Sequence, residues 1–136
     1  GLINKEWSNF LFNSQEAVSD TWYDMVAVAI DPVNPSKVYF GSWGRGLVET
    51  TNGIVDHIYR DHNSILEARV ESGFYFCNIG ALDFDDEGNL WIANSNANRV
   101  LKVKSGEDWY EFSLGSLAGS SSRIHCINHP RMEQST

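Results

Sequence analysis

The sequence has few basic residues, no long apolar run and only two cysteines. Its 136 residues include 10 basic and 18 acidic residues, and the formal net charge of −8 would repel nucleic-acid phosphates. No apolar run reaches the roughly 18 residues that a membrane-spanning helix needs, so no membrane insertion is expected in this segment. No charged and then apolar leader stands at the start, so any export signal is expected to have been removed. These features exclude nucleic acid and the membrane interior as partners of this segment.

Two stretches of the chain, residues 26–53 and 79–106, repeat one pattern. Each contains an apolar run that ends at an acid, a turn, two further short apolar runs and a closing turn with glycine. Short apolar runs and turns with a period of roughly 50 residues are typical of β-propeller blades. We therefore predict an all-β fold, a β-propeller fragment with four-stranded antiparallel blades. Matching positions that define the period are Asp31 and Asp85, Gly53 and Gly106, and, two steps apart, Trp7 and Trp109.

Four strands are predicted in each copy, from apolar runs that end at turn residues. Short strands such as residues 38–40 and 90–92 are apolar on both faces, which is typical of a sheet packed between other sheets. The predicted strands of the first copy are residues 25–30, 37–42, 46–50 and 54–59, and those of the second copy are residues 79–84, 89–94, 99–103 and 109–112.

All of residues 1–136 are predicted to be part of one propeller domain. A closed propeller contains roughly 4 to 8 blades, so two repeats account for only part of the ring. Uncovered blade faces and unpaired strand edges expose apolar area, and we therefore expect self-association or a longer parent protein. The predicted parts are an outer strand of a preceding blade at residues 1–12, blades at residues 24–62 and 77–113, and the start of a following blade at residues 123–128.

One rim of the blades is predicted to bind a ligand. Connections between blades and the turns between the second and third strands emerge on the same rim, and they carry aromatic, guanidinium and amide groups. Such groups suit stacking on sugars or contact with protein side chains. The alternative is that Trp43 packs between blades and Arg45 pairs with a neighbouring acid. The candidate ligand-binding residues are Trp22, Tyr23, Trp43, Arg45, Asn96, Asn98 and Arg99.

The remaining reactive groups favour structural roles. The acids at residues 83–87 could offer oxygen ligands to calcium, but their spacing differs from the EF-hand pattern and suits a turn. Asp31 and Asp85 occupy equivalent turns and so do not form an acid pair with unlike environments. Cys77 and Cys126 lie 49 residues apart, which leaves open whether they are buried thiols or a disulfide. We expect no catalytic residue, no metal and no cofactor, and keep a polysaccharide-active enzyme as the catalytic alternative.

Three motifs in a fixed order resemble a known group of propellers. They are S-W-G-R-G-L at residues 42–47, H-N-S-I-L at residues 62–66 and D-D-E-G-N-L-W-I-A-N-S at residues 85–95. The set resembles propellers of bacterial two-component regulators and, more closely, the seven-bladed propeller proteins of the Bacteroidetes type IX secretion machinery. Residues 88–100 are also similar to the NHL-type propeller repeat.

This resemblance implies a non-catalytic propeller in the periplasm or on the outer cell surface of a Gram-negative bacterium. By analogy with the sensor relatives, the chain is expected to be a ligand-sensing segment of a two-component regulator that responds to carbohydrate. The secretion relatives imply an alternative, a protein-docking scaffold of a secretion or surface complex. The expected partner is accordingly a carbohydrate or a surface protein.

Overall fold

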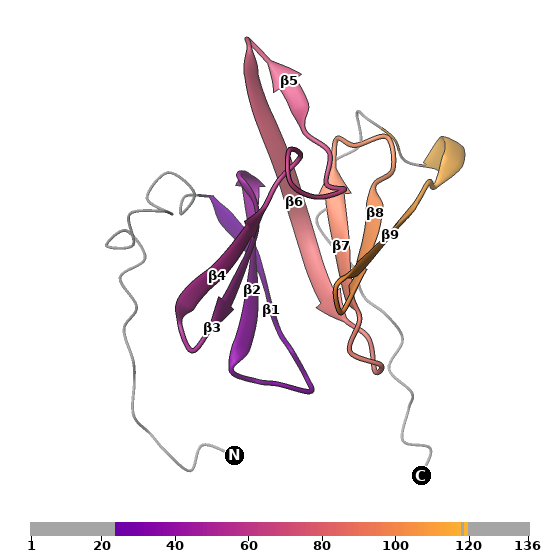
Figure 1. Cartoon of the computed structure of the whole chain (residues 1–136). Coiled ribbons are helices and arrows are strands. Elements are labelled where there is room, and N and C mark those ends of the chain that lie inside the picture. Colours follow the sequence, from indigo (N-terminus) through magenta and orange to yellow (C-terminus); the bar gives the residue numbers. More distant parts are fainter. Residues whose placement is uncertain (1–23, 118, 120–136) are drawn as a thin grey trace.

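The computed structural model describes residues 24–117 and 119, which form nine β-strands and one short 3-10 helix (Figure 1). This part of the chain contains no α-helix, so the predicted all-β class is confirmed. It also has no helix with the length and apolarity needed to cross a bilayer. The elements are β1 (Met25–Ile30), β2 (Lys37–Gly44), β3 (Gly46–Thr51), β4 (Ile54–Tyr59), β5 (Arg69–Glu71), β6 (Phe74–Phe84), β7 (Leu90–Ser95), β8 (Leu101–Ser105), β9 (Asp108–Phe112) and η3 (Gly115–Leu117).

The strands form two antiparallel blades of propeller type, β1 to β4 and β6 to β9. In each blade, successive strands pair with their neighbours from the innermost strand to the outermost one. The blades stand side by side with β1 and β6 in contact (Figure 1). Their ladders join where Trp43 pairs with Asn78 and Gly44 with Cys77. The predicted blade architecture is confirmed for the described residues, whereas the strands predicted within residues 1–12 and 123–128 lie outside them.

The repeat extends to the irregularities of the two inner ladders. The pairing of β1 with β2 shifts register between Met25 and Ala27, and the pairing of β6 with β7 shifts between Ile79 and Ala81. These positions differ by 54 residues, the period of the sequence repeat. A bulge of this kind bends a strand and increases its twist. Both inner strands are therefore bent at the same place.

The acids at the end of the inner strands cap turns, as the repeat predicts. Asp31 accepts hydrogen bonds from two backbone N–H groups of its own turn, at 2.8 and 3.2 Å. Asp85 accepts from the backbone N–H groups of Glu87 and Asn89, both at 2.9 Å, and from the indole of Trp91 at 2.9 Å. Burial opposes ionisation of Asp85, but these hydrogen bonds outweigh it and lower its pKa to about 2.

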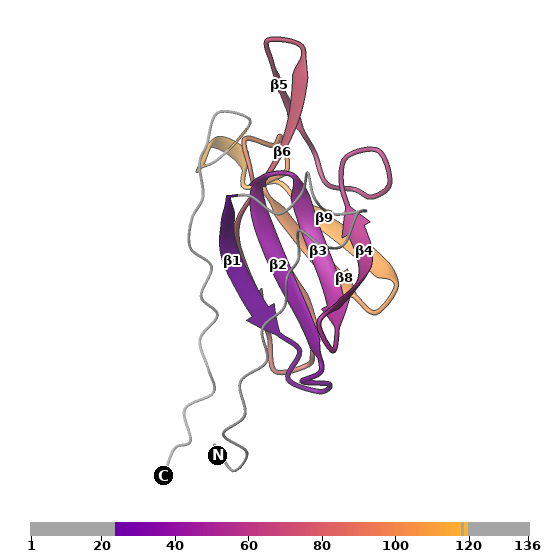
Figure 2. The ribbon, with the colours of Figure 1, turned by 90° about the vertical axis from the view of Figure 1, so that its left-hand side faces the viewer.

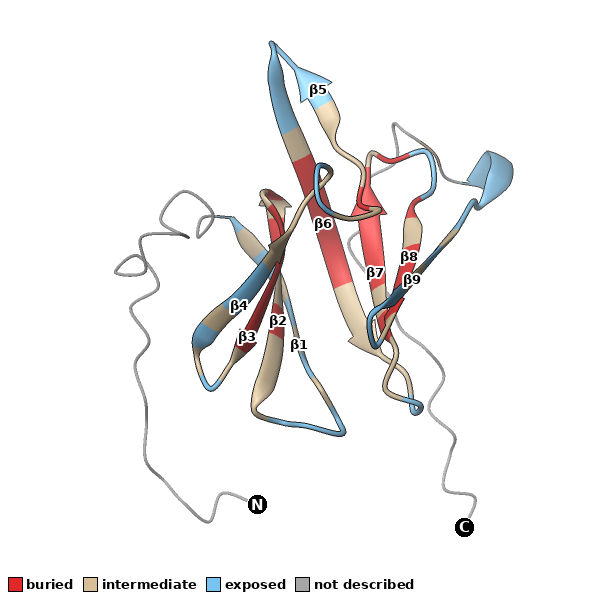
Figure 3. Ribbon diagram, in the orientation of Figure 1, coloured by how far each residue is buried: buried red, intermediate tan, exposed pale blue. Residues whose placement is uncertain are grey.

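Apolar side chains of the two blades meet in a buried contact, which we call the seam. Figure 3 shows that the buried residues lie on β2, β3, β6, β7 and β8, while β1, β4 and β9 contain none. Cys77 is a free thiol in the seam, and burial raises its pKa to about 12. The buried residues of the seam are Tyr39, Leu47, Leu66, Cys77, Ile79, Leu90 and Ile92, with Ala29, Tyr59, Ala68, Leu82, Phe84 and Trp109 packed against them.

One strand of the structure, β6, is longer than the strand predicted there. The strand predicted at residues 79–84 begins at Phe74, because residues 74–76 pair with β5. Ser72 and Gly73 join the two strands with φ values of 51° and 82°. Two successive residues of positive φ are the geometry of a tight hairpin turn. The other seven predicted strands begin and end within two residues of their expected bounds.

Candidate functional site on the rim around Asn78

One end of both blades carries the turns that were predicted to bind a ligand. This end, which we call the rim, comprises the end of β2, the β5–β6 hairpin and the turn between β7 and β8, at the top of Figure 1. Trp43 lies near the end of β2 and pairs with Asn78 of β6. Arg45 follows β2, forms a bridge to Cys77 and donates its backbone N–H to Ser42 Oγ at 3.2 Å. Both Trp43 and Arg45 are half-buried.

Asn78 connects the rim residues of the two blades. Its side chain is fully buried, and Oδ1 accepts hydrogen bonds from Arg69 Nε at 3.1 Å and from Asn96 Nδ2 at 3.3 Å. The backbone carbonyl of Asn78 accepts from Asn94 Nδ2 at 3.3 Å. Asn78 therefore links Trp43 of the first blade, through the backbone ladder, to Asn96 of the second blade, through its side-chain amide.

The amide of Asn78 has one orientation that its neighbours allow. If the amide were reversed, its N–H groups would face the donor groups of Arg69 and Asn96. In the observed orientation, Asn78 Nδ2 finds no hydrogen-bond acceptor within the described part of the chain. A buried donor without a partner costs roughly 1–3 kcal/mol. This donor offsets part of the stabilisation from the two hydrogen bonds that Asn78 Oδ1 accepts.

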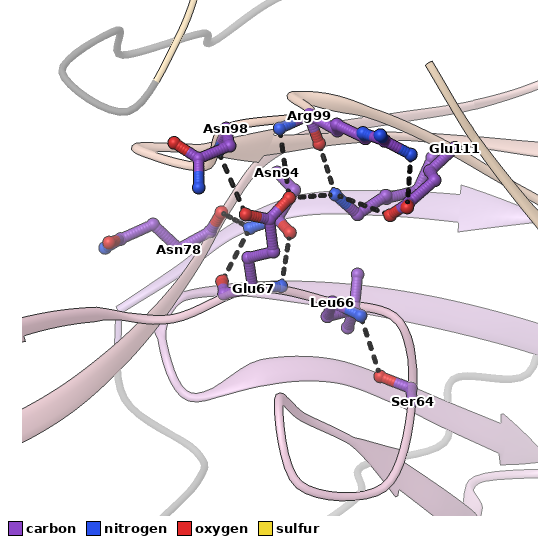
Figure 4. A network of polar contacts seen from close by, with 9 residues as sticks. Ser64, Leu66, Glu67, Asn78, Asn94, Asn98, Arg99 and Glu111 are labelled. Atoms are coloured by element: carbon purple, nitrogen blue, oxygen red, sulfur yellow. Dashed lines mark hydrogen bonds and ion pairs between the residues drawn. The ribbon is translucent and has the colours of Figure 1, made fainter. Parts of the chain in front are cut away.

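Glu67, in the connection between the blades, holds the turn between β7 and β8. Its carboxylate accepts from the backbone N–H groups of Asn98 and Arg99, both at 3.0 Å, and from Lys102 Nζ at 2.7 Å (Figure 4). The backbone N–H of Glu67 donates to Asn94 Oδ1 at 2.7 Å, and its carbonyl accepts from Asn94 Nδ2 at 3.0 Å. The connection is therefore bound to the second blade through the carboxylate, the backbone N–H and the backbone carbonyl of Glu67.

Lys102 is a fully buried lysine at the centre of this network. Its ammonium lies 2.7 Å from Glu67 and 3.7 Å from Glu111, and it also donates to the backbone carbonyl of Arg99. Burial opposes ionisation of Glu67, but hydrogen bonds from Lys102 and from the Arg99 and Asn98 backbone outweigh it. The pKa of Glu67 is therefore lower than usual. The guanidinium of Arg99 pairs with Glu111 at 2.9 Å.

The structure thus brings most of the predicted site residues to one rim. Some of their donors already have partners, because the backbone N–H groups of Asn98 and Arg99 bind Glu67 and the Arg99 guanidinium binds Glu111. That these residues bind a ligand stays a prediction. The residues on the rim are Trp43, Arg45, Asn96, Asn98 and Arg99, and the two outside the described residues are Trp22 and Tyr23.

The β5–β6 hairpin projects beyond the blades, as Figures 1 and 2 show. Its base is braced, because Arg60 Nη2 donates to the carbonyl of Tyr75 at 3.1 Å and the Arg69 guanidinium lies 4.9 Å from the centre of the Phe76 ring. Exposed apolar side chains on a braced projection are typical of protein contact surfaces. Those on the hairpin are Val70, Phe74 and Tyr75, which are 60%, 68% and 60% exposed.

Sequence reasoning missed the hairpin, Glu67 and Asn78. A signal for the hairpin exists: the runs R-V-E and F-Y-F flank a Ser-Gly pair, which is a hairpin pattern. No local pattern identifies Glu67, because the residues that it binds, Asn98, Arg99 and Lys102, lie 31 to 35 positions later.

No protein-family model matches the chain, and a search of curated protein sequences gives no match. Among solved structures, the chain is similar to PorZ. That protein is described as an essential bacterial surface component of the type IX secretion system of Porphyromonas gingivalis. The two are 25% identical with a TM-score of 0.63, and the match covers 73% of this chain but 13% of the PorZ chain. The similarity agrees with the resemblance to type IX secretion proteins, and these comparisons give no support to a two-component regulator.

Proposed function

We propose that this chain is a non-catalytic propeller section of a type IX secretion component at the cell surface, where it acts as a docking scaffold for another protein. The observation that carries this proposal is the similarity to PorZ, at 25% identity over 73% of the chain. The motifs at residues 42–47, 62–66 and 85–95 support the same assignment. The secretion scaffold is therefore preferred over the carbohydrate sensor.

The shape of the rim supports a protein partner. Carbohydrate and other small ligands bind in concave sites that converge polar groups on the ligand. The β5–β6 hairpin is instead a projection that exposes Phe74 and Tyr75. Exposed aromatic side chains of this kind fill pockets on a partner protein and account for much of the binding energy of an interface. We propose the hairpin as the centre of the docking surface.

The carboxylates of the repeated turns support a non-catalytic role. A general acid needs a raised pKa so that it holds a proton near neutral pH. The pKa of Asp85 is instead lowered to about 2 by hydrogen bonds from its turn and from Trp91, against the effect of burial. Asp31 holds the equivalent turn in the first blade.

The proposal is tested in the bacterium that encodes the chain, by changing Phe74 and Tyr75 together to serine in the full-length protein. The matched control is Val33→Ser, because Val33 is 78% exposed in a turn at the opposite end of the blades. Export of type IX cargo is measured in the culture medium, and the amount of the protein at the cell surface is measured with an antibody on intact cells.

We expect the hairpin variant to reach the surface in normal amounts and to export less cargo, and the control to behave as the wild type. Normal export by a strain that lacks the protein would contradict a role in secretion. The carbohydrate alternative is tested on a glycan array with the wild type and Trp43→Ala. Binding by the wild type that the variant loses would favour the sensor instead.

A further inference from the structure

Strand β5, in the projecting β5–β6 hairpin, has one edge that no strand covers within the described residues. Among these residues it pairs with β6 alone, and the turn residues 72–73 close the hairpin on the pair of Glu71 and Phe74. A two-residue turn of this type is flanked by a hydrogen-bonded pair, and the next pair along the ladder is not hydrogen-bonded. That next pair is Val70 with Tyr75. The backbone N–H and C=O groups of both residues therefore point away from the hairpin.

The two edges of the hairpin differ in what they offer a partner. On the β6 side, the Tyr75 carbonyl accepts a hydrogen bond from Arg60 Nη2 at 3.1 Å, which agrees with its outward direction and occupies it. On the β5 side, no described residue hydrogen-bonds to the backbone of Val70, which is 60% exposed. An exposed edge with an unpaired donor and acceptor is a template for one more strand. The open edge of the hairpin is therefore the β5 edge.

The sequence of β5 is complementary to itself. Its residues are Arg69, Val70 and Glu71. An antiparallel strand of the same sequence, centred on Val70, would place Arg69 of each copy opposite Glu71 of the other. Opposite charges directly across a ladder stabilise the pairing, and like charges destabilise it. Within one copy Arg69 already pairs with Glu71, so charges of opposite sign would alternate around the contact. The partner that fits this edge is therefore a second copy of β5.

We propose that two copies of this chain dimerise by antiparallel pairing of their β5 strands, with Val70 of one copy opposite Val70 of the other. Each Val70 N–H donates to the Val70 carbonyl of the other copy, and one sheet with the order β6–β5–β5–β6 results. The contact is isologous, because the same edge of each copy meets across a two-fold axis. The hairpin stands beyond the blades (Figures 1 and 2), so the contact is independent of the number of blades in the complete protein.

The hairpin is preorganised for this contact, but the interface is small. Its base is braced by Arg60 at Tyr75 and by Arg69 over the Phe76 ring, so pairing requires little further ordering of the backbone. β5 has 3 residues, and a contact of this length buries less area than a permanent dimer interface does. We therefore expect a weak dimer that forms at high protein concentration.

Dimerisation leaves the docking side chains of the hairpin open. Strand pairing uses the backbone at the edge, and the side chains of successive residues point to opposite faces of the sheet. Phe74 and Tyr75 therefore lie on opposite faces, and the dimer carries both copies of each in one sheet. This contact goes beyond the proposed docking of another protein, and the oligomeric state tests it separately from that function.

The backbone contact is tested with Val70→Pro, which removes the N–H group at the open edge. Proline is tolerated where the N–H of an edge strand faces solvent, so β5 can still pair with β6. Val70→Thr is the matched control, because it keeps the N–H group and a β-branched side chain. Mass is measured by sedimentation equilibrium on the purified full chain up to about 1 mM, and circular dichroism checks that each variant is folded.

We expect the wild type and Val70→Thr to dimerise, and Val70→Pro to dimerise at least about tenfold more weakly, because hydrogen bonds across the two-fold axis are lost. A wild type that is still a monomer at about 1 mM would overturn the proposal. So would a Val70→Pro variant that dimerises as strongly as the wild type.

The charge pattern gives a second test, which holds even if Val70→Pro does not fold. Arg69→Glu gives a strand with an acid on both sides of Val70, and Glu71→Arg gives a strand with a base on both sides. Each variant alone should be a monomer, because like charges face each other across the ladder, whereas an equimolar mixture should form mixed dimers. A mixture that stays monomeric, or either variant forming homodimers as stable as those of the wild type, would contradict pairing in this register.

Discussion

Strands β3 and β8 occupy the same place in the two blades but bury different side chains. Where β3 has Val48 and Thr50, β8 has Lys102 and Lys104, and all four residues are at most 7% exposed. Lys102 binds Glu67 in the connection between the blades. The comparison shows that the repeat preserves the shape of a blade, whereas buried charges distinguish the second blade and mark the side that receives the first.

Lys104 shows how such a charge is accommodated. Its ammonium lies 6.0, 5.7 and 5.9 Å from the ring centres of Tyr39, Tyr59 and Trp109, and 3.7 Å from Glu49. Burial opposes ionisation of Glu49, but hydrogen bonds from Tyr39 and Lys37 and the charge of Lys104 outweigh it and lower its pKa. Buried ion pairs add little net stability but are costly to break. Our hypothesis is that these pairs specify which blade faces meet.

The largest effect is expected from Glu67→Ala. This change leaves the fully buried ammonium of Lys102 without its nearest carboxylate and frees two backbone N–H groups of the β7–β8 turn. Loss of one partner of a buried pair costs roughly 3–5 kcal/mol. We expect about 3 kcal/mol, at the lower end, because Glu111 remains 3.7 Å from Lys102. Urea unfolding measures the loss.

Two further variants make this comparison sharper. Glu107→Ala removes an exposed acid from the β8–β9 turn and should change the free energy of unfolding by less than about 0.5 kcal/mol. Adding Lys102→Met to Glu67→Ala makes β8 more like β3 and should recover part of the loss. If the double variant were less stable than Glu67→Ala alone, the ion pair would not be the source of the effect.

Lys104→Met removes the second buried charge and keeps an unbranched side chain that is one atom shorter. The variant loses the contact with three rings, the attraction of Glu49 and a hydrogen bond to the carbonyl of Gly106 at 2.6 Å. We expect a cost of about 2 kcal/mol. Lys37→Met is the control, because Lys37 also pairs with Glu49 but is 29% exposed. If the two variants lost the same free energy of unfolding, the burial of Lys104 would not add to the effect of its charge.

Gly41→Ala tests a second difference between the blades. Gly41 and Ala93 occupy equivalent positions, but a Cβ added at Gly41 would lie 2.6 Å from Cγ2 of Ile79 in the seam. Ile79 is fully buried and can move little, so we expect a cost of about 1–2 kcal/mol. Thermal unfolding measures it. Gly119→Ala, which has nothing within 4 Å of the added Cβ, is the control and should leave the melting temperature unchanged.

The smallest effect concerns acid. The pKa of Asp85 is about 2 in the folded state, against an ordinary value of 3.8 for the unfolded chain, so its contribution to stability is complete above about pH 5. That contribution is lost as the pH falls from about 5 to 1, because the unfolded state takes up the proton first. Asp85→Asn should reduce the dependence of unfolding on pH in this range. Trp91→Phe removes the indole donor alone and should give an intermediate slope, whereas a slope unchanged in both variants would exclude Asp85 as the cause.

Most of the fold could be predicted because its determinants are local. The apolar runs, the turn acids Asp31 and Asp85 and the glycine turns recur with one period, and they define the strands without knowledge of distant contacts. The buried lysines could not be predicted in this way. Residues 101–105 alternate apolar and polar side chains, which is typical of a strand with one face in water. Only the partners Glu49 and Glu67, far away in sequence, explain why both lysines are buried.

The candidate site was predictable in its position but not in its contacts. Equivalent turns of neighbouring blades emerge at one end, so Trp43 and Asn96 could be assigned to the same rim. The binding of Asn98 and Arg99 by Glu67 depends on the path of a connection that has no periodic pattern. The position of Asn78 Nδ2, which has no acceptor among the described residues, likewise follows from how two blades meet, which single-sequence patterns do not specify.

The short ladder between β2 and β6 has a consequence for the size of the whole ring. Within the described residues, the blades share paired backbone positions only at Trp43 with Asn78, Gly44 with Cys77 and Arg45 with Cys77. Few backbone pairings therefore oppose a change in the angle between the blades. The wedge angle, and with it the number of blades that complete one turn, is therefore adjustable by substitutions between blades while each sheet stays intact.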